Sequence, residues 1–338
     1  MDTTIAIVVA TIAFAICSFA APIGETLGLI DRPDGRRKLH ARATPLVGGL
    51  AIALPVAGAA LWQAATTEFW PLQATLGLVV LAFMLLGMAD DRHHISPAWR
   101  LALALAICIA AMTAVPGLRV DYLRFSFVYR VFLLDAWSTF FTLLCLIGLV
   151  NALNMADGKN GLLSGLGLFW TAMLAIKAPA HVQPLLLALG AALAVVFAFN
   201  VAGRVFLGDS GSYALGALFG FLAIHVHDAR ADWLPSDRVA LWFFVPVIDC
   251  LRLMATRIVL GKSPFSSDRN HLHHILDDAM PWKFGLALYL GLSIAPALAA
   301  EALPRLALLW AMIAFGVYFA LIALLPRIGQ ASRGPAGA

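Results

Sequence analysis

The chain has 338 residues, of which 62% are hydrophobic and only 12% are charged. Soluble domains carry roughly 25% charged residues, so this chain has too few polar side chains to cover a water-soluble fold. Apolar runs of roughly 17–25 residues, the length that a helix needs to cross a bilayer, recur along the sequence. The composition therefore predicts an integral membrane protein. The net charge of +4 is explained by basic residues at the ends of the apolar runs rather than by a nucleic-acid partner.

Eleven apolar segments are expected to form the transmembrane helices of an all-α fold. In chain order they cover 3–22, 45–65, 71–89, 99–115, 133–150, 162–177, 184–201, 212–228, 239–258, 284–301 and 305–325. Residues 1–326 are expected to form a single transmembrane domain, and 327–338 a short cytoplasmic tail. The first segment lacks the basic start of a cleaved signal peptide and is interpreted as a retained span.

The distribution of Lys and Arg predicts the orientation in the membrane. With the N-terminus outside and the C-terminus in the cytoplasm, 16 of the 23 basic residues lie on the cytoplasmic side, as the positive-inside rule requires. The dense polar clusters fall on that side too, at 31–40, 90–94, 151–161, 208–212 and 267–274. Five separated loops that meet at one face predict an active site that faces the cytoplasm and takes a soluble cosubstrate.

Two adjacent carboxylates, Asp90 and Asp91, directly follow the third apolar segment. Neighbouring carboxylates repel each other, so they need a cation, a lysine or a shared proton. The pair is a candidate catalytic group. A solvated pair that simply ends a helix is the alternative, and this short motif does not decide between the two.

The segment NALNMADGKNG at 151–161 carries a more specific signal. Asn151, Asn154 and Asp157 recur every third residue, which predicts that a helix brings them near one another. Gly158 and Gly161 then end the helix and allow the backbone to approach a ligand. Polar side chains beside a membrane span cost free energy unless each finds a partner. The segment is therefore predicted to bind a ligand.

Asp209 lies between Gly208 and Gly211 at the start of the eighth apolar segment. Its carboxylate is a candidate ligand for Mg²⁺, which prefers a few carboxylate oxygens together with waters and substrate phosphates. Capping of the helix that follows is the alternative role for this residue.

A loop near the C-terminus carries His271, His273 and His274 together with Arg269. Imidazole and guanidinium N–H groups donate to anionic oxygens, so these side chains are candidates for binding a diphosphate. A zinc site is an alternative, although the spacing is not that of a helical i, i+4 pair and no cysteine or nearby acid completes it. A plain loop is the other alternative.

Two further charged groups have two interpretations each. Arg36 and Lys38 belong to a basic cluster that either binds a phosphate or serves only the positive-inside signal. Asp249 and Arg252 lie three residues apart inside an apolar segment, where ionisable residues usually mark function. A structural ion pair between the two is the alternative.

Taken in order, the motifs resemble those of the polyprenyl-phosphate N-acetylhexosamine-1-phosphate transferases, the MraY/WecA superfamily, and most closely its WecA-like branch. The resemblance covers about Asp31 to Leu276 and rests on the motifs DRPDGRRKLH, PLVGG, DDR, NALNMADG, VFLGDSGS and SPFSSDRNHLHH. It implies a bundle of ten or eleven transmembrane helices, often dimeric, in the bacterial inner membrane. It also implies transfer of a sugar-1-phosphate from a UDP-N-acetylhexosamine, most often UDP-GlcNAc, to undecaprenyl phosphate. The lipid-linked product would start O-antigen, common-antigen or wall-polymer synthesis.

The resemblance also implies roles for individual residues. Asp90 matches the candidate base, Asp91 its companion carboxylate, and Asp209 the magnesium ligand. Further matches are Asp157 and Asn154 in the nucleotide pocket, Phe206 stacked on uracil, and His271, His273 and His274 in the histidine loop. Asp209 with Asp91 or Asn160 is expected to hold Mg²⁺, with Mn²⁺ as an alternative ion.

Two positions depart from the branch. His94 and Asn160 stand where the branch usually has acids, so the chain has less negative charge there and a second carboxylate beyond Asp157 is missing from that loop. A multispanning sugar or lipid transporter is the main alternative function. It would place ionisable residues near span midpoints in two repeated halves, whereas here they gather at one face.

Overall fold

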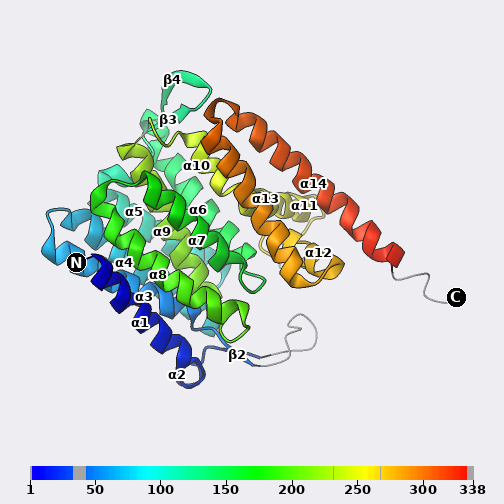
Figure 1. The fold of residues 1–338 in the computed structure, drawn as a ribbon, viewed down its shortest axis with the longest axis horizontal. Helices are drawn as coiled ribbons and strands as arrows, with labels where there is room; N and C mark the ends of the chain where they lie inside the picture. Colours follow the sequence, from blue (N-terminus) through cyan, green and yellow to red (C-terminus); the bar gives the residue numbers. More distant parts are fainter. Residues whose placement is uncertain (1, 33–42, 231, 267, 333–338) are drawn as a thin grey trace. The chain divides into compact units, whose positions relative to one another are not determined.

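The computed structural model describes residues 2–32, 43–230, 232–266 and 268–332, and these are helical almost throughout (Figure 1). Each of the eleven segments that were expected to be helical is helical over most of its length, and 3–22 and 239–258 are each divided between two helices. The α-helices are α1 (Asp2–Ser18), α2 (Ala20–Leu27), α3 (Gly48–Thr66), α4 (Trp70–His93), α5 (Pro97–Ala114), α6 (Ser138–Ala156), α7 (Leu162–Lys177), α8 (Gln183–Val201), α9 (Gly208–Ala229), α10 (Ser236–Trp242), α11 (Phe244–Val259), α12 (Leu272–Ala279), α13 (Trp282–Ala302) and α14 (Ala307–Ser332).

Short elements fill some of the connections. Strand β1 (Ile30–Asp31) pairs antiparallel with β2 (Thr44–Pro45), and β3 (Tyr122–Phe125) lies beside β4 (Val128–Leu133). Four single 3₁₀ turns are η1 (Pro116–Leu118), η2 (Asp135–Trp137), η3 (Ala180–Val182) and η4 (Pro304–Leu306). The all-α class predicted from the sequence is therefore confirmed, with two small strand pairs in the connections.

Seven helices in the described part of the chain are long and apolar enough to cross a membrane. The number rises to nine if α1 with α2, bent by 72°, and α10 with α11, bent by 73°, each form one broken span. Helix α7 has only 16 residues, and α9 is not among these candidates although it has 22. The chain is thus a multi-pass membrane protein, while eleven spans and the orientation of the termini stay predictions.

The chain folds into two compact units. Unit 1 comprises Met1–Tyr122 and Leu133–Leu234, and unit 2 comprises Leu123–Phe132 and Pro235–Ala338. The single domain expected over 1–326 stays a prediction. Helix α14 continues to Ser332, so the first half of the expected tail is helical.

Helix α9 forms the core of unit 1. Seventeen of its 22 residues are buried, and it packs against α3, α4, α6 and α7. On one side the fully buried ring of Trp170 in α7 meets Phe219 edge to face, with ring centres 5.2 Å apart. Helix α8 packs against α1, α3 and α7. A helix that is buried on nearly all sides can carry polar groups only where other elements satisfy them.

Unit 2 is built around α13 and α14, which run side by side (Figure 1), with α10, α11 and α12 packed against them. An ion pair of 2.9 Å between Arg238 and Glu301 joins α10 to α13. The β3–β4 turn is attached to the start of α10, because the backbone N–H of Arg124 donates to Ser236 Oγ at 3.0 Å and that of Ser126 to Asp237 Oδ1 at 2.9 Å.

Candidate functional site

The end of α4 and the start of α9 meet through the carboxylate of Asp91. Its Oδ1 accepts a hydrogen bond from the backbone N–H of Asp209 at 3.0 Å, and its Oδ2 accepts from that of Ser210 at 3.2 Å. The first N–H groups of a helix have no partner within the helix, so they need an acceptor from elsewhere. Asp91 supplies this acceptor from another helix, and its position is thereby tied to that of Asp209.

The end of α6 reaches the same place through one of its two asparagines. Asn154 Nδ2 donates to Asp209 Oδ1 at 2.6 Å and to Ser212 Oγ at 3.0 Å. Asn151 Nδ2 instead donates to the carbonyl of Ile147 in its own helix at 2.8 Å. The three-residue spacing in the sequence does not distinguish the two asparagines. In the structure, Asn154 binds α9, whereas Asn151 binds the backbone of its own helix.

Asp157 ends α6 and adds a third carboxylate to the group. Its backbone N–H donates to the carbonyls of Leu153 and Asn154 at 3.1 and 3.2 Å. Burial raises the pKa of its side chain well above the ordinary value, and the nearby charges of Asp209 and Asp91 raise it further. The structure thus brings Asp91, Asn154, Asp157 and Asp209 together from three helices of unit 1.

Asp90 has a different surrounding from its neighbour. Its side chain is 4% exposed, and its Oδ2 accepts hydrogen bonds from Arg100 Nη1 and from the hydroxyl of Tyr213, both at 2.7 Å. Arg100 also donates to the Tyr213 hydroxyl at 2.9 Å. The sequence motifs did not indicate Arg100 or Tyr213 as site residues. Arg100 was used only to predict the orientation in the membrane. The available signal was weak: Tyr213 lies one helical turn after Asp209, and Arg100 lies one turn into α5.

Two glycines allow the close approach of α4 and α9. A Cβ atom at Gly87 would overlap the carbonyl group of Asp209. Gly208 has φ of +71°, in the left-handed region that favours glycine, and a Cβ there would lie 2.7 Å from Asp91 Oδ2. Only glycine combines this conformation with this proximity.

The loop after α6 is held by a residue that the interpretation of the sequence also missed. Asn200 in α8 is 3% exposed; its Oδ1 accepts from the backbone N–H of Gly161 at 2.6 Å, and its Nδ2 donates to the carbonyl of Val205 at 2.9 Å. Asn160 is half-buried in the same loop, and its Nδ2 would lie 3.4 Å from a Cβ at Gly203. An asparagine inside an apolar helix was the available signal.

Phe206 is half-buried beside the start of α3. Its backbone N–H donates to the carbonyl of Pro45, and its carbonyl accepts from the N–H of Gly48, both at 2.9 Å. These bonds fix its backbone next to Gly208 and Asp209. Its stacking on uracil stays a prediction.

The histidine loop lies in unit 2, where His271 precedes α12 and the other two histidines lie in its first turn. The rings of His271 and His273 are stacked with centres 5.1 Å apart, and those of His273 and His274 are 4.3 Å apart. Arg269 Nη2 lies 3.6 Å from Asp278 Oδ1. Among the described residues, no group of three or more His, Cys, Asp or Glu side chains is arranged to hold a metal ion by itself, and this holds for the histidine loop and for the acids of unit 1.

Ion pairs hold this part of unit 2. The Asp249–Arg252 pair is present at 3.0 Å, as the structural interpretation required. Arg257 in α11 binds Asp268 at 2.8 Å. Partial burial acts to raise the pKa of Asp268, but the N–H of Asn270 and the Arg257 guanidinium lower it below the ordinary value. Arg36 and Lys38 lie outside the described residues, and a ligand shared by the two units stays a prediction.

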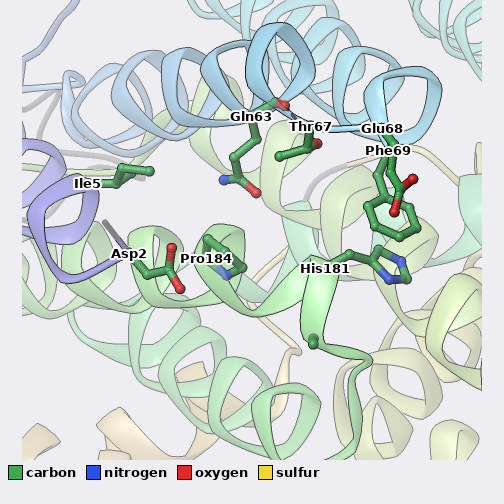
Figure 2. A pocket seen from close by; sticks show the side chains of 9 residues that line it. Asp2, Ile5, Gln63, Thr67, Glu68, Phe69, His181 and Pro184 are labelled. Atoms are coloured by element: carbon green, nitrogen blue, oxygen red, sulfur yellow. Dashed lines mark hydrogen bonds between the residues drawn. The ribbon is translucent and has the colours of Figure 1, made fainter.

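Unit 1 has a cavity of about 510 Å³, and Figure 2 shows the side chains that line it. Its wall includes Gln63 and Thr67 near the end of α3 and His181 in η3. The ring of His181 stacks on that of Phe69 with centres 4.1 Å apart. Helix α3 begins at Gly48 beside Phe206 and rises about 1.5 Å per residue, so the cavity is more than about 20 Å from the acids along its axis. The cavity is therefore separate from the candidate site.

Comparisons with known proteins agree with the motifs. The family model described as Glycosyl transferase family 4 matches residues 73–227. An undecaprenyl-phosphate alpha-N-acetylglucosaminyl 1-phosphate transferase of Yersinia pestis is 33% identical over 271 residues, covering 76% of this chain and 72% of the relative. Proteins of the same name from Escherichia coli K12, 30% identical with 76% and 71% coverage, and from Thermotoga maritima, 28% identical with 82% and 84% coverage, are also similar.

Proposed function

Because the chain belongs to the WecA-like undecaprenyl-phosphate N-acetylglucosaminyl 1-phosphate transferases of glycosyl transferase family 4, we propose that it transfers GlcNAc-1-phosphate from UDP-GlcNAc to undecaprenyl phosphate. An oxygen of the lipid phosphate attacks the phosphorus that carries the sugar. The bond from this phosphorus to the bridging oxygen breaks, and UMP leaves. The product is a lipid-diphosphate-sugar that starts O-antigen, common-antigen or wall-polymer synthesis.

The observation that carries this proposal is the meeting of three helix ends at Asp91, Asn154, Asp157 and Asp209. Phosphoryl transfer needs little covalent chemistry from the protein, and catalysis consists mainly of positioning and charge neutralisation. The charges of Asp209 and Asp91 act on the buried Asp157, so negative charge is concentrated at this place. A cation that binds there together with the diphosphate would offset this charge. A structural helix junction would not need this much negative charge.

These side chains fit Mg²⁺, which is held in proteins by one or two carboxylates plus waters and substrate phosphates rather than by a closed cage of side chains. Asp209 is the first candidate ligand, because Asn154 orients its carboxylate from the side. Asp91 already accepts two backbone N–H groups, although a carboxylate has about four acceptor positions. Asn160 is the third candidate. A bound Mg²⁺ would supply charge neutralisation at the diphosphate, and Mn²⁺ has the same preference for oxygen ligands.

We propose that Asp90 helps to orient the phosphate of the lipid rather than to remove a proton from it. Arg100 and Tyr213 already hold its Oδ2, and the Arg100 side chain stays 28% exposed. The remaining N–H groups of Arg100 are then available to donate to the phosphate of the lipid. Undecaprenyl phosphate is negatively charged at neutral pH, so its oxygen needs alignment more than deprotonation.

The membrane arrangement is also a proposal. Eleven spans, an outside N-terminus and a cytoplasmic C-terminus in the bacterial inner membrane would place the active site at the cytoplasmic face, where UDP-GlcNAc is available. The bias of basic residues supports this orientation. The meeting of the ends of α4 and α6 with the start of α9 supports a site at a single membrane face. A homodimer is the expected assembly.

The test uses the purified full chain in lipid nanodiscs with undecaprenyl phosphate, Mg²⁺ and UDP-GlcNAc, followed by measurement of UMP and of the lipid product. Release of one UMP per lipid-diphosphate-sugar supports the proposal. A panel of other UDP-N-acetylhexosamines then defines the donor. Binding or vesicle uptake of intact UDP-GlcNAc without UMP release would instead support the transporter alternative.

A further inference from the structure

Asp249 is a buried carboxylate in the middle of α11, with 3% of the residue exposed. Its Oδ1 accepts hydrogen bonds from the hydroxyl of Tyr318 at 2.6 Å, from Arg252 Nη2 at 3.0 Å and from the backbone N–H of Leu272 at 3.2 Å. The three donors come from α14, α11 and α12. They hold the carboxylate in one orientation, with Oδ2 left for a different partner.

That partner is the imidazole of His271, whose Nδ1 lies 2.9 Å from Asp249 Oδ2. An ionised carboxylate can only accept a hydrogen bond, so the proton of this contact belongs to Nδ1 of the ring. The tautomer of a histidine is set by the hydrogen bond that its other nitrogen makes. In the neutral ring Nε2 is therefore the nitrogen without a proton, and it can only accept a hydrogen bond.

The rest of the loop fixes the ring in place. His271 is 7% exposed and stacks on His273 with an angle of 14° between the rings. Arg252 donates to the carbonyl of Asn270, the residue before His271, and its Nε donates to the Tyr318 hydroxyl at 2.6 Å. An ion pair between Asp249 and Arg252 would need none of the contacts to His271, so these contacts indicate an additional role for the carboxylate.

We propose that Asp249 is a positioning residue for the transferase reaction, which holds His271 in the tautomer with the proton on Nδ1, so that Nε2 accepts a hydrogen bond from the P–OH group of a singly charged substrate phosphate. This inference rests on the proposed function, because it assigns the phosphate of that reaction as the ligand of Nε2. Arg252 and Tyr318 serve the same end through Asp249. Partners of this kind behind a metal-binding histidine typically matter about 10–100-fold for affinity or activity, and we expect an effect of the same order here.

The first experiment observes the tautomer directly. Solid-state NMR of the protein labelled with ¹⁵N-histidine in lipid would assign the signals of His271 by their loss in His271→Ala. We expect a protonated Nδ1 and an unprotonated Nε2 for neutral His271, and loss of this pattern in Asp249→Asn. A neutral His271 with its proton on Nε2 in the wild-type protein would overturn the proposal, without any need for Asp249→Asn to fold.

The second experiment is a double-mutant cycle on turnover. We expect Asp249→Asn to lower kcat about 10–100-fold in the wild-type background, and to change it less than about twofold when His271→Ala is already present, because Asp249 acts through that ring. An equal loss in both backgrounds would show a purely structural role and overturn the proposal. Asp249→Glu keeps the acceptor and should restore part of the activity.

The control removes an ion pair of similar burial in the same unit. Glu301→Gln removes the ion pair between Glu301 and Arg238, whose side chains are 17% and 7% exposed, respectively. The side chains of Asp249 and Arg252 are 5% and 15% exposed. We expect the Tm of Glu301→Gln to fall as that of Asp249→Asn does, while kcat and the His271 signals stay those of the wild type. A wild-type protein that released no UMP would contradict the proposed function, whereas the NMR result would stand unaffected.

Discussion

The sharpest test of the catalytic geometry is Gly87→Ala, because Gly87 lies where α4 touches the start of α9. A Cβ atom at this position would lie 2.5 Å from the backbone nitrogen of Ser210, which is 0.9 Å short of the 3.4 Å at which ordinary contact begins. It would overlap the carbonyl group of Asp209 still more closely. Backbone atoms cannot swing away as a side chain can, so α4 and α9 must separate by about 1 Å.

Two effects of different size follow from this separation. Overpacking of a tight core typically costs about 1–3 kcal/mol of stability, so a moderate fall in Tm is expected. A displacement of about 1 Å at a catalytic group can cost about 100-fold in rate. Activity should therefore be lost far more than folding, because the displaced atoms belong to Asp209 and its hydrogen bond to Asp91.

The assay compares UMP release and thermal unfolding of Gly87→Ala with those of Gly58→Ala in α3. A Cβ at Gly58 meets nothing within 4 Å, so this variant has the same chemical change without the overlap and should keep the wild-type kcat. If Gly87→Ala turned over at the wild-type rate with an unchanged Tm, the close packing of α4 on α9 and the positioning argument built on it would be wrong.

Three further predictions concern the same site. Asp209→Asn should lower kcat by at least about 100-fold while the protein stays folded. Mg²⁺ should raise the Tm of the wild-type protein, because the ion binds the native state, and should no longer raise the Tm of this variant. An equal Mg²⁺ effect on the Tm of both proteins would remove Asp209 as the ligand. The raised pKa of Asp157 means that its ionisation destabilises the folded state as pH rises above the unfolded-state value of 3.8. In EDTA, Asp157→Asn should therefore raise Tm at pH 7.5 more than at pH 5, and a pH-independent difference would contradict the shift. Asn200→Ala leaves the buried N–H of Gly161 without its acceptor and should lower the free energy of unfolding by about 1–3 kcal/mol, measured by denaturant or thermal unfolding. It should also raise the KM for UDP-GlcNAc. Wild-type stability of this variant would show that the loop does not depend on Asn200.

The local predictions succeeded where the signal is short in range. The apolar segments predicted helices, because the length and composition of each segment are properties of neighbouring residues. The glycine-flanked Asp209 lies in the first turn of α9, and Asp157 ends α6, as the glycines beside them predict. The capping alternative for Asp209 is wrong, because α9 has no side-chain cap and Asp91 accepts its first N–H groups. The number of spans was harder to predict, since a bend such as the one of 72° between α1 and α2 depends on packing.

The pairwise contacts were not predictable in the same way. Asp91 and Asp209 are 118 residues apart in the chain, and Asp249 and Tyr318 are 69 apart. One sequence shows that each side chain needs a partner, but several residues of the right chemistry compete to supply it. Asn151 and Asn154 look equivalent in the motif, and only the position of α9 separates them.

The sequence by itself determined that this chain enters a membrane, which segments become helices, and which family's motifs it carries, since hydrophobicity and motif spacing are encoded locally. The tertiary structure alone decided that Arg100 and Tyr213 hold Asp90, that Asn200 supports the glycine loop, and that Asp249 faces His271. The physical reason is that a buried polar group must be satisfied by whichever group the packed helices bring near it, and helix packing is a property of the whole chain.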